Sequence, residues 1–187
     1  CSSDAINAGI VLIPEDRKKD GLCTKLSIRD NIALPNLPMI SGKLTGKVNK
    51  KSEAEMVNKG KSSLTIKMAN AEVDAGTLSG GNQQKIVVAK WLARESEVII
   101  FDEPTRGIDV AAKVEIYEII NELKKQGKAV IVISSEMPEV MGISDRILVM
   151  CEGRITGELT SEEATENNIL SCAMRFEDKA NKQKAAS

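Results

Sequence analysis

Two short segments of the sequence carry residues suited to phosphate chemistry. In the first, residues 98–109 (VIIFDEPTRGID), an aliphatic run ends in the adjacent acids Asp102 and Glu103. The carboxyl ends of strands in open α/β sheets face the ligand crevice, where one acid can hold Mg²⁺ and its neighbour can prepare a water molecule. Side chains alternate along a strand, so the two acids can take different roles. Taken alone, acids at this place often merely end a strand.

The second segment, residues 78–85 (LSGGNQQK), combines glycines with the start of a helix. Gly80 and Gly81 let the backbone approach an anion closely, and the N–H groups and dipole of the following helix favour a phosphate. Ser79 adds a hydroxyl donor. For SGG alone, a tight turn before a helix would be the simpler interpretation.

The periodicity of the chain predicts the elements that position these residues. Strands are expected at 9–14, 98–101 and 129–134, and helices from the glycine loop to about Arg94, over 110–125 with Asp109 as N-cap, and from near Pro138. A hairpin is expected at 146–151 and 154–159, and Thr160 with Glu163 forms a capping box for a last helix ending near Met174. This alternation predicts an α/β fold with a mostly parallel sheet and an antiparallel hairpin at one edge.

Four segments follow from these elements. Residues 1–26 form a strand and loop of the core, and residues 27–77, with a helix start at Ser27 and Asp30, form a separate helical insert. Residues 78–176 carry the remaining core elements, and 177–187 are a charged tail. Within the insert, residues 41–63 are rich in lysine, serine and glycine, which favours a solvated lobe or loop over an anion-binding or membrane-surface patch.

Composition narrows the possible functions. The 26 basic and 27 acidic residues give a net charge of −1, which does not support general nucleic-acid binding. Histidine is absent, so any mechanism must do without the commonest general base. The four cysteines are expected to be free thiols. No run approaches the ~20 apolar residues of a bilayer span, and we expect a cytoplasmic protein.

In combination, the two segments resemble the ATP-binding-cassette (ABC) ATPases over residues 9–174. Residues 78–82 match the family signature, usually LSGGQ, and residues 98–103 match Walker B. Residues 107–109 match the D-loop, 13–15 fall at the Q-loop, and 134–136 fall at the switch loop. The resemblance implies a P-loop NTPase-like sheet with a helical subdomain, and ATP with Mg²⁺ as cofactors.

Residues 14–21, 78–85, 102–113 and 134–140 narrow the resemblance to the second cassette of tandem monosaccharide importers of the ribose, xylose and galactoside type. Glu15 replaces the Q-loop glutamine and Ser135 replaces the switch histidine, as is typical of these cassettes. The resemblance makes Glu103, Asp102, Ser135 and Glu15 the catalytic set, with Asp102 holding Mg²⁺ through water. Both replacements suggest slow turnover at this site.

No GxxxxGK[ST] phosphate-binding loop occurs in the sequence. We therefore expect a C-terminal part of a cassette, truncated before the Walker A strand and loop, that does not hold ATP alone. Loss of a central strand would expose apolar edges at 9–14 and 98–101, so the fragment is expected to self-associate.

Cassettes of this family pair head to tail, which implies that this chain acts on ATP held by the first cassette. The signature residues that would close over that ATP in trans are Leu78, Ser79, Gly80, Gly81, Asn82 and Gln83, and the D-loop residues are Gly107, Ile108 and Asp109. The implied partners are that first cassette, a transmembrane permease and, indirectly, an external sugar-binding protein, at the cytoplasmic face of the membrane. Two alternatives stay open: a non-transport ABC ATPase and a nucleotide-independent interaction fragment.

Overall fold

The computed structural model describes residues 1–42 and 45–174, which fall into two compact units. The first unit runs from Cys1 to Ile133 and the second begins at Ser134. The boundary lies directly after a strand, and each unit is described by itself below.

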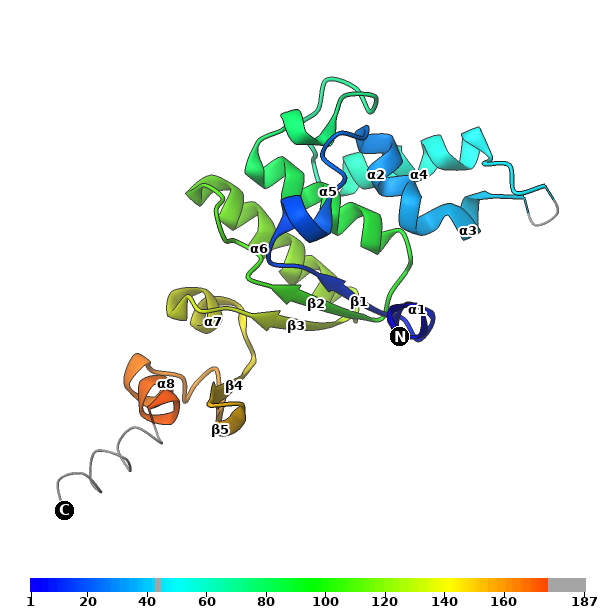
Figure 1. Cartoon of the computed structure of the whole chain (residues 1–187). Helices are drawn as coiled ribbons and strands as arrows, with labels where there is room; N and C mark the ends of the chain where they lie inside the picture. The colour runs from blue at the N-terminus through cyan, green and yellow to red at the C-terminus, as the bar shows by residue number, and fades with distance from the viewer. Residues whose placement is uncertain (43–44, 175–187) are drawn as a thin grey trace, which may run out of the picture. The chain divides into compact units, whose positions relative to one another are not determined.

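The first unit is built on a parallel sheet of three strands (Figure 1). The strands are β1 (Ile10–Ile13), β2 (Val98–Asp102) and β3 (Ala129–Ile133), in the order β1-β2-β3. Their register places Leu12 beside Ile100, and Ile100 beside Ile131. The expected strands and their parallel pairing are therefore confirmed.

The two faces of this sheet differ sharply in exposure. On one face Val11, Ile13, Ile99 and Phe101 are at most 3% exposed. Helices α5 (Gly80–Leu92) and α6 (Val110–Lys125) pack against the sheet, α5 on β1 and α6 on β3. Each large apolar side chain buried in this way contributes about 1.5–3 kcal/mol to folding.

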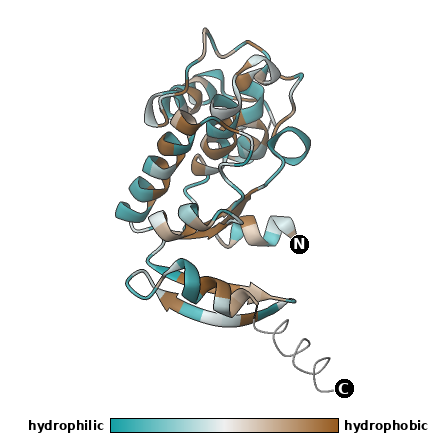
Figure 2. Ribbon diagram, turned by 90° about the vertical axis from the view of Figure 1, so that its left-hand side faces the viewer, coloured by the Kyte–Doolittle hydropathy of each residue, from teal (hydrophilic) through white to brown (hydrophobic). Residues whose placement is uncertain are grey.

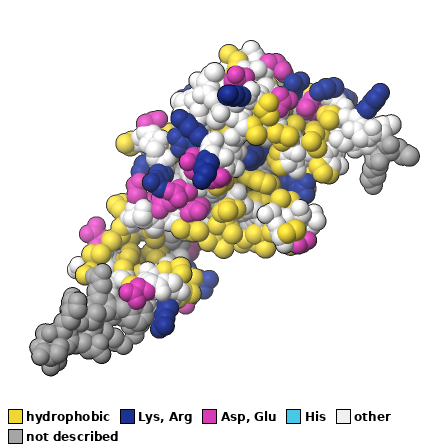
Figure 3. Space-filling model, in the orientation of Figure 1, with side chains coloured by type: hydrophobic (Ala, Val, Ile, Leu, Met, Phe, Trp, Pro, Cys, Tyr) yellow, Lys and Arg dark blue, Asp and Glu magenta, His cyan; other side chains and the backbone are white. Residues whose placement is uncertain are grey.

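The opposite face of the sheet carries apolar side chains that stay accessible to solvent. Ile10 is 37% exposed, and Leu12, Ile131 and Ile133 are each 49% exposed. The strands are hydrophobic along their length (Figure 2), and apolar side chains gather along the sheet on the molecular surface (Figure 3). An apolar face of this kind marks an interaction surface or a site of association.

The strand order corrects one expectation. We expected an open edge at Val98–Phe101, but β2 pairs with β1 on one side and with β3 on the other. Among the described residues, the strands with one partner are β1 and β3. The prediction was wrong because the order of strands along the chain does not give their order in the sheet.

Short helices form a separate layer beside α5. They are α2 (Ile28–Ala33), η2 (Leu34–Asn36), α3 (Leu37–Ile40), α4 (Lys50–Ser63) and η3 (Ala75–Thr77), whereas α1 (Ser2–Asn7) contacts β1. The helix start at Ser27 is confirmed, because its hydroxyl accepts from the Asp30 N–H at 3.0 Å. Within residues 41–63, for which we expect a solvated lobe or loop, residues 50–63 form α4, and Asn49 caps this helix by accepting from the Lys51 and Ser52 N–H groups.

Two buried asparagines fix this layer in place. The Asn36 amide donates to the carbonyls of Ile32 at 2.7 Å and Lys90 at 2.8 Å, which ties the layer to α5. Asn31 accepts from the Cys23 N–H at 2.8 Å and donates to the carbonyls of Cys23 and Ser27. Buried backbone groups need hydrogen-bond partners. The two asparagine side chains supply them where no regular secondary structure does.

The second unit contains α7 (Met137–Ile143), β4 (Arg146–Cys151), β5 (Arg154–Thr160) and α8 (Glu166–Ala173). The hairpin is confirmed, with Glu152 and Gly153 at positive φ in its turn. Its expected place at one edge of the parallel sheet is wrong, because β4 and β5 form a two-stranded sheet of their own. Thr160 and Glu163 do hydrogen-bond each other, but they close a turn. The cap of α8 is Thr165, so the predicted start was wrong by a few residues. The charged tail from residue 177 lies outside the described residues.

Candidate functional site

The signature segment forms an uncapped helix start. Ser79 occupies the N-cap position of α5, and its side chain makes no capping hydrogen bond. The first N–H groups of a helix have no partner within the helix, so this end presents backbone donors. Asn82 Nδ2 donates to Ser79 Oγ at 2.9 Å, while Asn82 Oδ1 accepts from the Lys67 N–H at 2.8 Å. Since Ser79 Oγ already accepts, its own proton is available to an external acceptor.

Other signature residues serve to position the loop. Gln83 is only 2% exposed, and its amide donates to the carbonyls of Leu78 at 2.9 Å and Gly76 at 3.3 Å. Gly81 lies where α5 meets α6: a Cβ added to it would lie 2.5 Å from the Cβ of Ala112. Within the segment, Ser79 is therefore exposed, while Gly81 and Gln83 face inward.

The two acids stand at the carboxyl end of β2, as expected. Asp102 is the last residue of the strand, and both Asp102 and Glu103 are half-buried. Glu103 adopts φ of +45°, and its N–H donates to the carbonyl of Ile133 at 2.8 Å. Positive φ at a residue other than glycine stores strain and is frequent at functional sites. The neighbouring β3 thus fixes the backbone from which the Glu103 carboxylate projects.

The D-loop connects these acids to α6 through a compact turn. The Arg106 N–H donates to the Glu103 carbonyl at 3.1 Å, and the Ile108 N–H donates to the Thr105 carbonyl at 3.4 Å. Gly107 takes φ of +67°. Asp109 then caps α6, accepting from the Ala112 N–H at 3.0 Å, which confirms its predicted role as N-cap.

The segment after β1 reaches this turn through Arg17. Asp16 caps a single π-helical turn, η1 (Arg17–Gly21), by accepting from the N–H groups of Lys18 and Lys19. Arg17 Nη1 donates to the Arg106 carbonyl at 2.9 Å, and Nη2 donates to the Gly107 carbonyl at 3.0 Å. The Glu15 carboxylate pairs with the Arg106 guanidinium. Glu15 is therefore engaged by a D-loop side chain.

The structure brings together the segments that carry Glu15, Gly80 and Gly107. Ser135 lies in the second unit, where the neighbouring Glu136 N–H donates to Ser134 Oγ at 3.0 Å. Sequence reasoning did not single out Arg17, although it lies in the matched segment 14–21. Arg17 contacts backbone carbonyls, which every residue carries. The sequence therefore shows no acidic partner from which this contact could be predicted.

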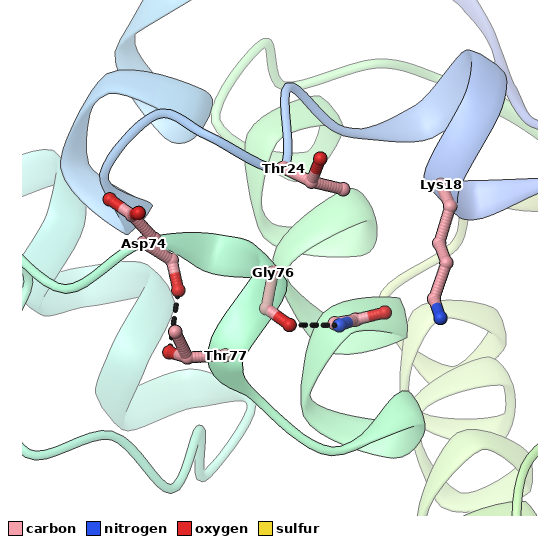
Figure 4. A pocket seen from close by; sticks show the side chains of 6 residues that line it. Lys18, Thr24, Asp74, Gly76 and Thr77 are labelled. Atoms are coloured by element: carbon pink, nitrogen blue, oxygen red, sulfur yellow. Dashed lines mark hydrogen bonds between the residues drawn. The ribbon is translucent and has the colours of Figure 1, made fainter.

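A pocket of about 320 Å³ opens between η1 and the loop before α5. It is lined by Lys18, Thr24, Asp74, Gly76, Thr77 and Gln83. Figure 4 shows the Lys18 side chain on one side and the turn of Asp74 to Thr77 on the other. Gln83 Oε1 is buried there without a hydrogen-bond partner. Buried polar atoms are usually paired, so this oxygen is an exception.

The positions of the acidic side chains limit where a divalent cation could bind. Within residues 1–42 and 45–174, no group of three or more acidic or cysteine side chains gathers as a metal cage. Mg²⁺ in nucleotide sites commonly uses one or two carboxylates together with substrate phosphates. Asp102 at the end of β2 fits that pattern, so it could hold Mg²⁺ only together with a nucleotide.

Comparison with known proteins gives consistent matches. A sequence model described as "ABC transporter" matches residues 2–106. The chain is 52% identical over 174 residues to a ribose import ATP-binding protein of Clostridium perfringens, covering 93% of this chain and 34% of that protein. It is 50% identical over 173 residues to a xylose import ATP-binding protein of Moorella thermoacetica, covering 92% and 34%. The chain thus spans about a third of the length of these relatives.

Solved structures agree on the fold. The cbiO1 protein of Clostridium perfringens, part of the cbiONQ ABC transporter complex, matches with a TM-score of 0.70 at 21% identity, covering 88% of this chain and 62% of that one. A putative metal-chelate type ABC transporter in an inward-facing conformation matches with a TM-score of 0.72 at 18% identity, covering 89% and 63%. No helix among the described residues is long and apolar enough to span a membrane.

Proposed function

This chain belongs to the ABC transporter family, and we propose that it is part of an ATP-hydrolysing subunit that energises monosaccharide import. Its contribution is the signature segment, which closes over Mg-ATP held by another cassette. The observation that carries the proposal is the uncapped start of α5, where Ser79 is exposed and its hydroxyl proton is free to donate. A helix start of this kind favours a phosphate group.

The D-loop supports the same role. Its turn from Glu103 to Asp109 leads directly into α6, and α6 contacts the start of α5 where Gly81 meets Ala112. The signature segment and the D-loop are neighbours in the first unit, since a Cβ built on Gly80 would lie 3.3 Å from the Gly107 carbonyl oxygen. Asp102 and Glu103 would serve the chain's own nucleotide site, together with a Mg²⁺ ion, and we propose that this site turns over slowly.

The pocket beside η1 is the proposed contact with a transmembrane permease at the cytoplasmic face of the membrane. Lys18 and Thr24, from residues 15–25, line it together with the turn of Asp74 to Thr77 and Gln83. Gln83 also holds the carbonyls of Gly76 and Leu78, directly before Ser79. A partner bound there would contact Thr77, two residues before the signature serine Ser79.

The sugar is proposed to be a pentose, because the relatives at about half identity are named for ribose and xylose import. The permease and an external binding protein would read the sugar. We further propose that the chain by itself self-associates, because one face of its sheet exposes Ile10, Leu12, Ile131 and Ile133. These proposals concern partners, and they leave the trans role of Ser79 unaffected.

Two substitutions in the full-length protein test the trans role. Ser79→Arg places a bulky cation at the start of α5 and should lower kcat for ATP hydrolysis by about a hundredfold or more, the loss typical of a removed oxyanion donor. Glu103→Gln, at the chain's own site, should reduce kcat less. Ser161→Arg, at an exposed serine of the second unit, is the matched control and should leave kcat unchanged. Equal losses from Ser79→Arg and Glu103→Gln would refute the division of roles.

A further inference from the structure

One guanidinium group joins three separate segments of the first unit. Arg17 Nη1 and Nη2 donate to the carbonyls of Arg106 and Gly107 at 2.9 and 3.0 Å. A Cβ built on Gly80 would lie 2.8 Å from Arg17 Nη2 and 3.3 Å from the Gly107 carbonyl oxygen. The start of α5, the D-loop and the turn after β1 thus meet at this side chain, although they lie far apart in the sequence.

The glycines at this junction are part of the arrangement. Gly80 leaves space for the Arg17 guanidinium, since any side chain there would meet it. Gly107 adopts φ of +67°, which other residues rarely adopt, and its carbonyl accepts from Arg17. The backbone of both motifs is therefore shaped around one planar cation.

We propose that Arg17 is a positioning residue, which holds the D-loop and the start of the signature helix as one preformed surface for the ATP of the opposite cassette. This inference rests on the proposed function of the signature segment. Arg17 itself does not touch the nucleotide in this account. It fixes the relative position of Ser79 and the D-loop before the cassettes close. No additional backbone segment then has to become ordered when they close.

The chemistry of the contact explains why arginine occupies this position. Hydrogen bonds from a charged donor are stronger than neutral ones, and the planar guanidinium presents two parallel N–H donors that a lysine cannot reproduce. The ion pair between Arg106 and Glu15 is exposed, at 67% and 43% of the side chains. Exposed pairs with a single contact contribute little, whereas Arg17 makes two hydrogen bonds to adjacent carbonyls of the D-loop.

Hydrogen exchange in the full-length protein tests the local effect. The N–H groups of Arg106 and Ile108 are hydrogen-bonded within the D-loop turn. Arg17→Met keeps the length of the side chain and removes both donors, so exchange at these two amides should accelerate by about tenfold or more. Arg17→Lys should give a smaller acceleration and provides the comparison if Arg17→Met does not fold. Lys125→Met, at the opposite end of α6 from the D-loop, is the charge-matched control and should change neither amide.

Steady-state kinetics of the same variants test the effect on function. If Arg17 preforms the trans surface, Arg17→Met should lower kcat by about tenfold while KM for ATP stays within about twofold, because the partner cassette still holds the nucleotide. Unchanged exchange at Arg106 and Ile108 in both Arg17 variants would overturn the proposal. A uniform rise in exchange across the first unit would also overturn it, because it would indicate a general loss of stability.

The two proposals fail in different ways. If Ser79→Arg left ATP hydrolysis intact, the trans role would be wrong, but the exchange comparison would still report whether Arg17 orders the D-loop. If Ser79→Arg abolished hydrolysis and Arg17→Met did not alter kcat, the trans role would stand and the role of Arg17 would be refuted.

Discussion

Replacing Gly81 with alanine should push the start of α5 away from α6. The new Cβ would lie 2.5 Å from the Cβ of Ala112 and 3.8 Å from its Cα. Non-bonded carbons prefer separations of ~3.5–4.0 Å, so the two helices must part by about 1 Å at this point. Ala112 is 7% exposed and lies in the first turn of α6, so the clash has no flexible side chain to absorb it.

The net effect on stability follows from two opposing quantities. Overpacking a close contact typically costs ~1–3 kcal/mol. Exchanging glycine for alanine inside a helix stabilises the helix by at most ~0.5–1 kcal/mol. We therefore expect Gly81→Ala to lower the free energy of unfolding by about 1–2 kcal/mol. The same displacement would move Ser79 and Gly80, and a misplacement of about 1 Å can reduce turnover by roughly a hundredfold.

Gly60→Ala in α4 is the matched control, because its added Cβ would lie 3.2 Å from the Cβ of Ala89. That contact needs only a slight adjustment, so the helix-propensity gain should nearly balance it. Urea unfolding of the chain at low concentration can be followed by the fluorescence of Trp91, the single tryptophan, which lies in α5. Equal midpoints for Gly81→Ala and the unchanged chain, or a larger loss from Gly60→Ala, would refute the reasoning.

Three further predictions follow from the same contacts. Asn31→Ala should lower the free energy of unfolding by about 2–3 kcal/mol, because it leaves backbone groups of the loop at Cys23 without partners; a midpoint shift near zero in urea would contradict this. Burial, partly opposed by Cys23, holds the pKa of Lys90 below its ordinary value of 10.5. The unfolded chain then binds more protons between that lowered value and 10.5, so the free energy of unfolding should rise with pH across this window, and Lys90→Met should remove the slope in urea titrations at several pH values. Ile131→Lys should weaken self-association of the chain, because Ile131 is 49% exposed on the open sheet face. An unchanged sedimentation coefficient in sedimentation velocity would show that another surface mediates the association.

The elements of the core could be predicted because their signals are local. The strands β1, β2 and β3 are short aliphatic runs, and Asp109 precedes an amphipathic helix with its cap in place. The signature helix begins with two glycines, and Gly81 has a physical reason, since it meets Ala112. Each of these features depends on neighbouring residues, which the sequence displays directly.

What the sequence could not predict depends on pairing at long range. The place of β2 in the middle of the sheet follows from contacts with β1 and β3, so the open edge was assigned wrongly to Val98–Phe101. Helix α4 carries few large apolar residues, so its pattern does not distinguish a solvated lobe from a loop, yet Asn49 caps it and Val57 is buried. The contact from Arg17 to the D-loop joins residues 89 and 90 positions apart through backbone carbonyls.

The most direct test of the account is to find which peptide of this chain touches the phosphates of ATP bound to the opposite cassette. An ATP analogue with a photoreactive group on its γ-phosphate would be crosslinked in the full-length protein, and the labelled peptides identified by mass spectrometry. The account predicts a label on the peptide that carries Ser79, and loss of that label in Ser79→Arg. A label confined to other peptides, or one on the Ser79 peptide that survives when the first cassette cannot bind ATP, would contradict a role in trans.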